Sequence, residues 1–421
     1  MAIGFSDITY TIASGPCTST FAYRVYIGIV TVTGTVGVPS ACYPNLGDAF
    51  NSINNGVHRG NVEVMINGNT VEPVTAVLYQ SGFVGPTGTS QYNNPLRIYP
   101  TQGNLSVTGN INAPLIQLNG VGTTPVANPS RVIFDGRVNQ VGVGDLIVTN
   151  ISTGNGANTS TFQFINSSNG NRIQFVNIKG STTSLTSGVI HFSTSTGGNG
   201  NDNNVIDNNN ISSETTGRPV NVIYSFGSGG ARDNTSVIIS NNNIFNFFNP
   251  GLSSQALNIR ANSNGWTISG NSFYETTNFT STSNVEYAVI RFNNTSGVNF
   301  NVNGNYMSGN DRLGIGTWNK TGGNNTFYGL YIILANTNPA SNSITANIIR
   351  GFNWVNSGAA DWTGIRLQHG VVLLGGVLPI NGNLIGSTAE SGSITQFHLL
   401  FHTKYSWYLC IERHLSSYNW L

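Results

Sequence analysis

Two interleaved series of short apolar motifs recur along the chain at nearly the same spacing. The first series has register residues separated by 33, 34, 33, 40 and 35 positions: Ile190, Ile223, Leu257, Ile290, Leu330 and Ile365. The second series has steps of 33, 29, 34, 42 and 36 positions: Ile211, Ile244, Phe273, Met307, Ile349 and Ile385. Two series that drift together indicate a repeat unit with fixed strands and loops of variable length, which is typical of a solenoid.

Within the motifs, apolar and polar residues alternate. Residues 190–192 (Ile-His-Phe) and 290–292 (Ile-Arg-Phe) each place one polar side chain between two apolar ones, which is the period of a half-buried β-strand. The chain contains 61 Asn and 51 Gly, and both are poor helix formers, so a helical bundle or coiled coil is excluded. Asn-Asn, Asn-Gly and Ser-Gly pairs bound the strands and supply turn residues.

Asn recurs at the same place in successive repeats, in segments such as NNNIS, NNNIF and GNSFY. Asn tolerates the left-handed backbone that sharp corners require. Amides at equivalent positions of stacked coils can also donate to one another. We therefore expect ladders of side-chain amides inside the stack.

This repeat resembles the right-handed parallel β-helix of the pectin-lyase-like superfamily over residues 45–395. More narrowly, it is similar to long secreted β-helix proteins of bacterial cell surfaces, in which such coils are separated by Ser/Thr/Gly/Asn loops. The periodicity predicts an all-β solenoid of stacked parallel strands, whereas the right-handedness is what the resemblance implies. Ten or eleven coils fit this region, which gives a rod on the order of 50 Å long.

Three regions follow from the pattern. Residues 46–53 place Leu46, Ala49, Phe50 and Ile53 on one helical face, so a short helix is expected to cap the first coil of the 45–395 solenoid. Residues 1–44 are rich in Thr and Val and are interpreted as a strand-rich segment, the remnant of a preceding module.

Residues 396–421 differ in composition from the solenoid. They contain no Gly but three of the six His, two of the six Trp, and Cys410. Two interpretations fit: a distinct C-terminal cap, or a non-native continuation of a truncated chain, and we favour the second. Because no secretion signal or sorting domain is visible, the expected extracellular or cell-surface location rests on composition and on the resemblance.

Charge and cysteine content exclude several classes. The formal net charge is +1, from 17 cationic and 16 anionic side chains, so no basic surface for nucleic acid is expected. No apolar run is long enough for a membrane span. Cys17 and Cys42 are either a disulfide pair or isolated thiols, and Cys410 is left unpaired in both cases.

Phosphate-binding, zinc-protease and nucleophile-elbow motifs are absent from the sequence.

Enzymes of the family that the chain resembles use clustered carboxylates or Ca²⁺, and the short acidic and Gly-His-Gly motifs of the polygalacturonase type are missing. The closest acidic group in the sequence is Asp202, Asp207 and Glu214. It is the candidate for a Ca²⁺ or carbohydrate-active site, although solvated loop acids are the favoured interpretation. We predict no catalytic residue, no metal ligand and no cofactor, with Ca²⁺ as the alternative.

One row of residues stands out as a candidate binding surface. The residue after each register position of the first series points away from the core, and the row reads His191, Tyr224, Asn258, Arg291, Tyr331 and Arg366. Tyrosine faces can stack on sugar rings, and Arg and Asn can donate hydrogen bonds to hydroxyls or uronic carboxylates. An ordinary sheet surface is the competing interpretation.

The leading functional prediction is a non-catalytic structural or adhesin-like segment of a bacterial surface protein. The first alternative is a polysaccharide lyase or glycoside hydrolase. The second is a non-catalytic module that binds an extracellular polysaccharide or cell-surface glycan through the row above.

Overall fold

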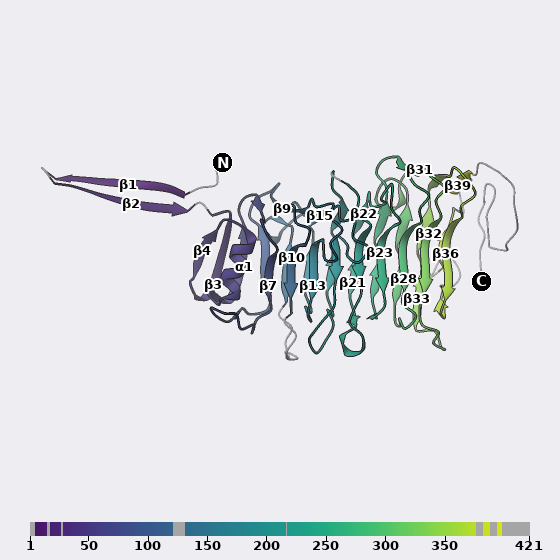
Figure 1. The fold of residues 1–421 in the computed structure, drawn as a ribbon, viewed down its shortest axis with the longest axis horizontal. Helices are drawn as coiled ribbons and strands as arrows, with labels where there is room; N and C mark the ends of the chain where they lie inside the picture. Colours follow the sequence, from purple (N-terminus) through teal and green to yellow (C-terminus); the bar gives the residue numbers. More distant parts are fainter. Residues whose placement is uncertain are drawn as a thin grey trace.

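Three long sheets of stacked strands make up the body of the protein. The computed structural model describes residues 5–14, 17–26, 28–120, 131–215, 217–375, 382–387 and 394–397. Within them the chain winds from sheet to sheet, and successive coils stack along one axis (Figure 1). The predicted all-β solenoid with a short helix is confirmed.

The nine-stranded sheet is entirely parallel. Its strands, in spatial order, are β7 (Ala76–Tyr79), β10 (Pro114–Asn119), β13 (Ser160–Ile165), β16 (Ile190–Phe192), β19 (Asn221–Ser225), β23 (Ser254–Arg260), β28 (Tyr287–Asn293), β32 (Phe327–Ile333) and β36 (Trp362–His369).

The twelve-stranded sheet begins with an antiparallel edge and continues in parallel. Its strands are β4 (Ser40–Tyr43), β3 (Val30–Gly37), β5 (His58–Ile66), β8 (Leu96–Pro100), β11 (Val132–Asp135), β14 (Arg172–Gln174), β17 (Val205–Asp207), β21 (Ile238–Ser240), β25 (Thr267–Ser269), β29 (Asn301–Asn303), β33 (Asn342–Thr345) and β37 (Val372–Leu373).

The ten-stranded sheet closes the cross-section. Its strands are β6 (Thr70–Val71), β9 (Ser106–Gly109), β12 (Ile147–Asn150), β15 (Asn177–Gly180), β18 (Asn210–Ser213), β22 (Asn243–Phe245), β26 (Ser272–Tyr274), β30 (Tyr306–Ser308), β34 (Ile348–Arg350) and β38 (Leu384–Ile385).

Both register series predicted from the sequence are paired in the structure. Ile190 pairs with Ile223, and the same column continues through Leu257, Ile290, Leu330 and Ile365. The second column likewise runs from Ile211 to Ile385. The inner members of both columns have no exposed surface, so they form continuous apolar files along the axis.

A buried ladder of asparagines runs beside the second column, as predicted. In it, the Nδ2 of each residue donates to the Oδ1 of the next, at 2.9 or 3.0 Å: Asn209, Asn242, Asn271, Asn305, Asn347 and Asn383. Each Oδ1 also accepts from the backbone N–H of the asparagine before it. The residue that precedes a ladder asparagine has a positive φ at Asn208, Asn241, Gly270, Gly304 and Ala346. The sharp corner and the amide ladder therefore come from one dipeptide.

Helix α1 (Leu46–Asn54) covers the first coil, and the four predicted apolar residues are fully buried. The Asn45 side chain caps its N-terminus by accepting from the Asp48 N–H at 2.7 Å. The Asn54 side chain pairs with edge strand β7, donating to the Val77 carbonyl and accepting from the Tyr79 N–H. The helix thus closes both the apolar interior and an open strand edge.

A fourth, parallel sheet lies on the last coils: β27 (Phe279–Ser281), β31 (Trp318–Gly322), β35 (Phe352–Val355) and β39 (Ile394–Phe397). The sequence pattern does not predict this sheet. Its second strand, β31, lies within residues 290–330 and within residues 307–349, which are the longest steps of the two repeat series. It encloses an aromatic cluster in which Phe327 lies 4.7 Å from Trp354 and 5.2 Å from Trp362, measured between ring centroids.

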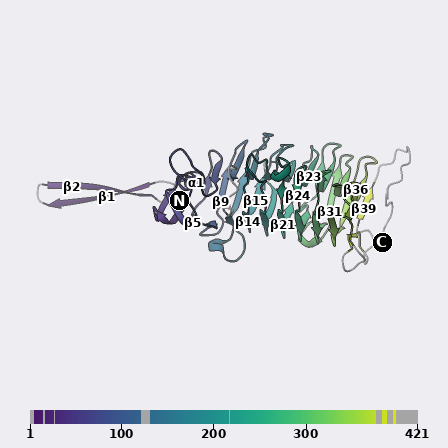
Figure 2. The ribbon, with the colours of Figure 1, turned by 90° about the horizontal axis from the view of Figure 1, so that it is seen from below.

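The remaining short elements lie in loops or at the N-terminus. They are β20 (Asn234–Thr235) and β24 (Ser263–Asn264), which pair with each other, and the 3₁₀ turns η1 (Val138–Gln140), η2 (Gly230–Arg232) and η3 (Arg312–Gly314). The hairpin of β1 (Phe5–Ser14) and β2 (Cys17–Tyr26) extends away from the stacked sheets in both views (Figures 1 and 2). Cys42 is a free, exposed thiol, and the side chain of Cys17 lies outside the described part.

Candidate functional site

The predicted row of outward residues is present in the predicted register. His191 pairs with Tyr224, and Asn258, Arg291, Tyr331 and Arg366 follow on successive strands of the nine-stranded sheet. Sequence periodicity therefore found residues that are up to 175 positions apart and yet form one file.

The two halves of this row differ in accessibility. His191, Tyr224 and Asn258 are 4–5% exposed, so the outward direction predicted for them does not bring them to solvent. Hydrogen bonds occupy this half: Ser187 Oγ lies 3.2 Å from His191 Nδ1, and Asn258 Nδ2 donates to Asn221 Oδ1 at 2.9 Å. Ser187 lies in the loop before β16, and Asn221 is the first residue of β19, so the apolar motifs alone do not reveal these contacts. Arg291, Tyr331 and Arg366 are only partly buried.

Burial also fixes the charge of His191. Desolvation lowers the pKa of His191 to about 3. Its ring packs edge-on against Tyr224, with the centroids 5.6 Å apart. A neutral imidazole in this setting is part of the packed sheet and supplies no positive charge to a ligand.

The accessible half of the row, Arg291, Tyr331 and Arg366, packs with the buried Tyr328 in a group of four side chains that we call the arginine–tyrosine cluster. The Cζ of Arg291 lies 4.4 Å from the ring centroid of Tyr331, and the Cζ of Arg366 lies 5.8 Å from the same centroid. Arg366 Nη1 donates to the Tyr328 hydroxyl at 2.9 Å. Because the guanidinium groups of neighbouring strands contact the Tyr331 ring, that ring is a weaker platform for a sugar than the sequence suggested.

Both arginines of the cluster have polar partners. Arg291 Nη2 forms an ion pair of 2.6 Å with Glu286 Oε1, and both side chains are partly exposed. Arg366 donates to Gln368 Oε1 at 2.8 Å through Nη2. Burial raises the pKa of Tyr328, so its hydroxyl stays protonated at neutral pH. Guanidinium groups form paired hydrogen bonds to carboxylate and sulfate groups, so Arg291 and Arg366 are the members of this cluster that suit an anionic ligand.

The structure does not bring the three acidic candidates together. Asp202 Oδ1 accepts from Thr235 N and Oγ1 at 2.8 and 2.9 Å. Asp207, on the twelve-stranded sheet, accepts from Ser240 Oγ at 2.7 Å through Oδ1. Glu214 lies 3.8 Å from the ammonium of Lys179, which is on the ten-stranded sheet. In the described ranges no group of three His, Cys, Asp or Glu residues is placed to hold a metal ion.

Asp202 has a different acidic neighbour from the one expected. Burial raises the pKa of Asp202, and the negative charge of Asp233 raises it further. Burial likewise raises the pKa of Asp233, while the hydrogen bond from Asn264 opposes this. The charge of Asp233 thus disfavours ionisation of Asp202, but no third acidic residue joins these two in a group that could hold a metal ion within the described residues.

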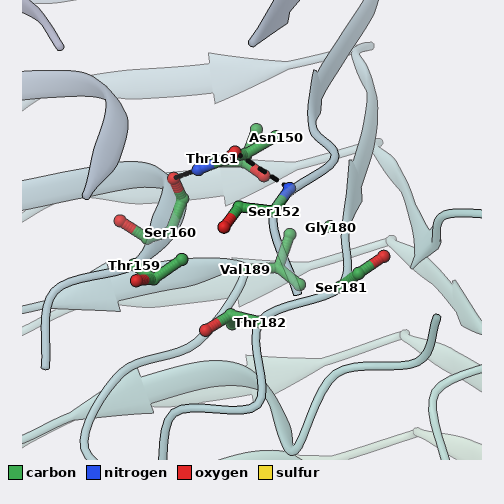
Figure 3. A pocket seen from close by; sticks show the side chains of 9 residues that line it. All are labelled: Asn150, Ser152, Thr159, Ser160, Thr161, Gly180, Ser181, Thr182 and Val189. Atoms are coloured by element: carbon green, nitrogen blue, oxygen red, sulfur yellow. Dashed lines mark hydrogen bonds between the residues drawn. The ribbon is translucent and has the colours of Figure 1, made fainter. Parts of the chain in front are cut away.

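The pocket drawn in Figure 3 lies where the ten-stranded sheet turns into the nine-stranded sheet. Its empty space of about 130 Å³ is partly open to solvent, and it is lined mainly by hydroxyl and amide groups. The Asn150 side chain pairs with polar groups of the lining: its Nδ2 donates to the Ser160 carbonyl at 2.9 Å, and its Oδ1 accepts from Ser152 N. This small, self-bonded niche is a structural corner.

Two buried charged groups are not predicted by the sequence pattern. Lys320 Nζ is surrounded by the carbonyls of Gly322, Gly323 and Val355 and by Asn356 Oδ1, at 2.7–3.0 Å. Burial lowers the pKa of Lys320 to about 8.

The second group is the ion pair of Glu275 with Arg218, at 2.5 Å. Burial raises the pKa of Glu275, and Arg218 opposes this. Neither charged group has a periodic signal in the sequence, because Lys320 lies on the added fourth sheet and the ion pair joins loop residues of different coils.

No helix in the described part of the chain has the length and apolar character needed to cross a bilayer. Comparison with known proteins gave no matching family model, no matching curated protein and no matching solved structure.

Proposed function

We propose that this protein is a non-catalytic structural or adhesin-like β-helix of a bacterial surface protein, and that its handedness and superfamily are those of the right-handed pectin-lyase-like fold. The observation that carries this proposal is the buried asparagine ladder, which hydrogen-bonds six successive coils. A continuous hydrogen-bonded file beside continuous apolar files gives a rigid rod.

The ladder supports a mechanical role because it links coils independently of the strands. Each rung has two bonds from one asparagine to the next, and the ladder residues from Asn209 to Asn347 are at most 1% exposed. Water cannot replace these bonds without opening the interior, so stretching along the axis must break them together with the strand pairing.

Force spectroscopy on the full chain tests this role. Pulling along the axis is expected to give high, stepwise unfolding forces, and Asn271→Ala is expected to lower the force at the affected coils. Incubation with acidic and neutral polysaccharides is the companion assay. Release of unsaturated uronides or new reducing ends would show that the protein is an enzyme and would overturn the proposal.

A second candidate function is binding of an anionic glycan at the arginine–tyrosine cluster. It is favoured by the two guanidinium groups of Arg291 and Arg366, which lie beside Tyr331 on a partly accessible sheet face. The accessible half of the row covers three strands, or about 10 Å, so a short stretch of polymer carrying uronate or sulfate groups fits it.

An array of acidic and neutral glycans measures this directly. The double variant Arg291→Gln and Arg366→Gln is expected to lose binding to acidic glycans. The double variant Arg232→Gln and Arg312→Gln, on the exposed 3₁₀ turns η2 and η3, is the charge-matched control. Equal binding of neutral glycans, or equal loss in both variants, would count against the cluster.

A further inference from the structure

The buried amine of Lys320 lies in an aromatic interior. On the fourth sheet, Lys320 of β31 pairs in register with Phe279 of β27 and with Trp354 of β35, so one aromatic residue lies on either side of it. Lys320 has no exposed surface, and its Nζ lies 5.3 Å from the ring centroid of Trp354. Lys179, on β15, is by contrast 36% exposed at its side chain. Lys320 is thus a primary amine that the fold withdraws from water.

A side-chain amide of the next coil lies directly against this amine. Asn356 Oδ1 lies 2.7 Å from Lys320 Nζ, and Asn356 is 1% exposed. Neighbouring backbone groups fix the orientation of the amide. Its Oδ1 also accepts from the Asn325 N–H at 3.1 Å, and its Nδ2 donates to the carbonyls of Asn325 and Ala360 at 3.2 and 3.0 Å. Because Oδ1 is bonded to Cγ, this contact places the amine nitrogen beside the amide carbon as well.

In the described part of the chain, no carboxylate holds the amine in its charged form. The other groups around Nζ are the carbonyls of Gly322, Gly323 and Val355, at 2.8–3.0 Å. Burial lowers the pKa of Lys320 to about 8, so about one amine in ten is neutral at pH 7. A desolvated, neutral lysine is a nucleophile, and this one is held against an amide carbon.

We propose that Lys320 and Asn356 are joined by an isopeptide bond that forms within the folded chain. The amine first loses one proton to solvent, and its nitrogen then attacks Cγ of Asn356. A C–N bond forms, and the electron pair of the C–O double bond moves onto Oδ1. The Asn325 N–H, which already donates to Oδ1, stabilises the negative charge that develops there.

The second half of the reaction releases ammonia. One proton of the attacking nitrogen passes to Nδ2, the Cγ–Nδ2 bond breaks, and the carbonyl forms again. The products are a secondary amide and one ammonia, so no oxidant, reductant or co-reactant is needed. Because β31 and β35 are neighbouring strands, the new bond joins two successive coils covalently. It strengthens these coils whether the chain acts as a rod or as a glycan-binding module.

Mass spectrometry of the full chain tests the bond. The protein is first incubated at pH 9, where most of the amine is neutral. Its intact mass is then expected to be lower than that of the sequence by one ammonia. After denaturation, trypsin is expected not to cut after Lys320 and to release a branched peptide that links residues 313–350 to residues 351–366.

The branched peptide decides the outcome, because a succinimide at an Asn-Gly pair loses the same ammonia. Cleavage after Lys320 without a branched peptide would overturn the proposal, whatever the intact mass. Lys320 would then be a free ammonium held by carbonyls. This comparison needs no substitution, so it stands even if a variant fails to fold.

Matched variants identify the reacting amine. Lys320→Met removes the amine but keeps an apolar stem, and it is expected to abolish the branched peptide. Lys179→Met, at the exposed lysine, is expected to leave it unchanged. The third lysine, Lys404, belongs to the C-terminal tail, whose residues 398–421 lie outside the described part, so both interpretations of that tail stay predictions. A branched peptide that contains Lys404 in place of Lys320 would overturn the assignment.

Discussion

At the scale of single residues, asparagine supplies many of the side-chain hydrogen bonds in this protein, in which few residues are charged. It supplies the left-handed corner, as at Asn208 and Asn241, and the buried amide that follows it. Such an amide donates twice and accepts twice without a net charge, so it can be buried at a small desolvation cost once every bond is made. This is the physical reason why a chain with 8% charged residues still has a well-satisfied polar interior.

Removing one rung of the ladder is expected to be costly. Asn271→Ala removes the donors to Asn305 and to the Ile239 carbonyl, and it leaves the N–H and Nδ2 of Asn242 without their acceptor. Buried unsatisfied groups cost about 1–3 kcal/mol each, so the free energy of unfolding should fall by about 3 kcal/mol in urea titration. Asn243→Ala is the control: the Asn243 side chain is partly exposed and donates to Asn210 Oδ1 at 2.8 Å, so its loss should cost less than about 1 kcal/mol.

The corner residue Ala346 offers a prediction of opposite sign. Its φ of 54° lies in the left-handed region, where L-residues are strained by roughly 1–2 kcal/mol. The equivalent corner at Gly304 has a φ of 63° and a glycine. Ala346→Gly should therefore raise the melting temperature, and a lower melting temperature would show that the alanine methyl contributes more by packing.

The buried His191 makes stability depend on pH. Its folded pKa of about 3 is below the ordinary 6.5, so between these values the unfolded chain binds a proton that the folded chain excludes. The free energy of unfolding should fall by about 2 kcal/mol from pH 7 to pH 5 through this residue alone. In His191→Gln, which copies Gln163 on the preceding strand, this part of the acid sensitivity should disappear; an unchanged pH profile would place the sensitivity elsewhere.

At the scale of elements, the strands of the three long sheets were easier to predict than the fourth sheet and the contacts that bury outward side chains. Strand register follows from periodicity, and α1 follows from one apolar helical face. The fourth sheet was not predicted because its strands lie in segments between the repeat motifs, which were expected to be long loops. The same limit explains the candidate row: its register was predicted, but not the loop contacts that bury His191, Tyr224 and Asn258.

The capping helix depends on a buried carboxylate. Glu72 is 2% exposed, and it accepts from the N–H groups of Leu46 and Gly47 at 2.9 Å, at the N-terminus of α1. Glu72→Ala leaves both donors unsatisfied and removes a favourable interaction with the helix dipole, so unfolding should become easier by about 2 kcal/mol. Glu72→Gln, which retains an acceptor, should lose less, and no loss in either variant would show that neither bond matters.

At the scale of the whole molecule, stability should be distributed along the axis. Each coil contacts only its neighbours, so the terminal coils have half the stacking of the central ones. Hydrogen exchange is expected to show the strongest protection at β19 and β23, in the middle of the nine-stranded sheet, and weaker protection at β37 and β38. Uniform protection would indicate that the whole rod opens in one step.

The sequence by itself determined the repeat, the inner columns, the asparagine ladder and the N-terminal helix, because each depends on local spacing along the chain. Only the tertiary structure decided which outward residues are accessible, since their burial depends on loops that have no period. It also decided that the acidic residues stay apart and that Arg291, Tyr328, Tyr331 and Arg366 meet on one face. Proximity of side chains from different coils follows from how the coils stack, and that is set by the packed interior.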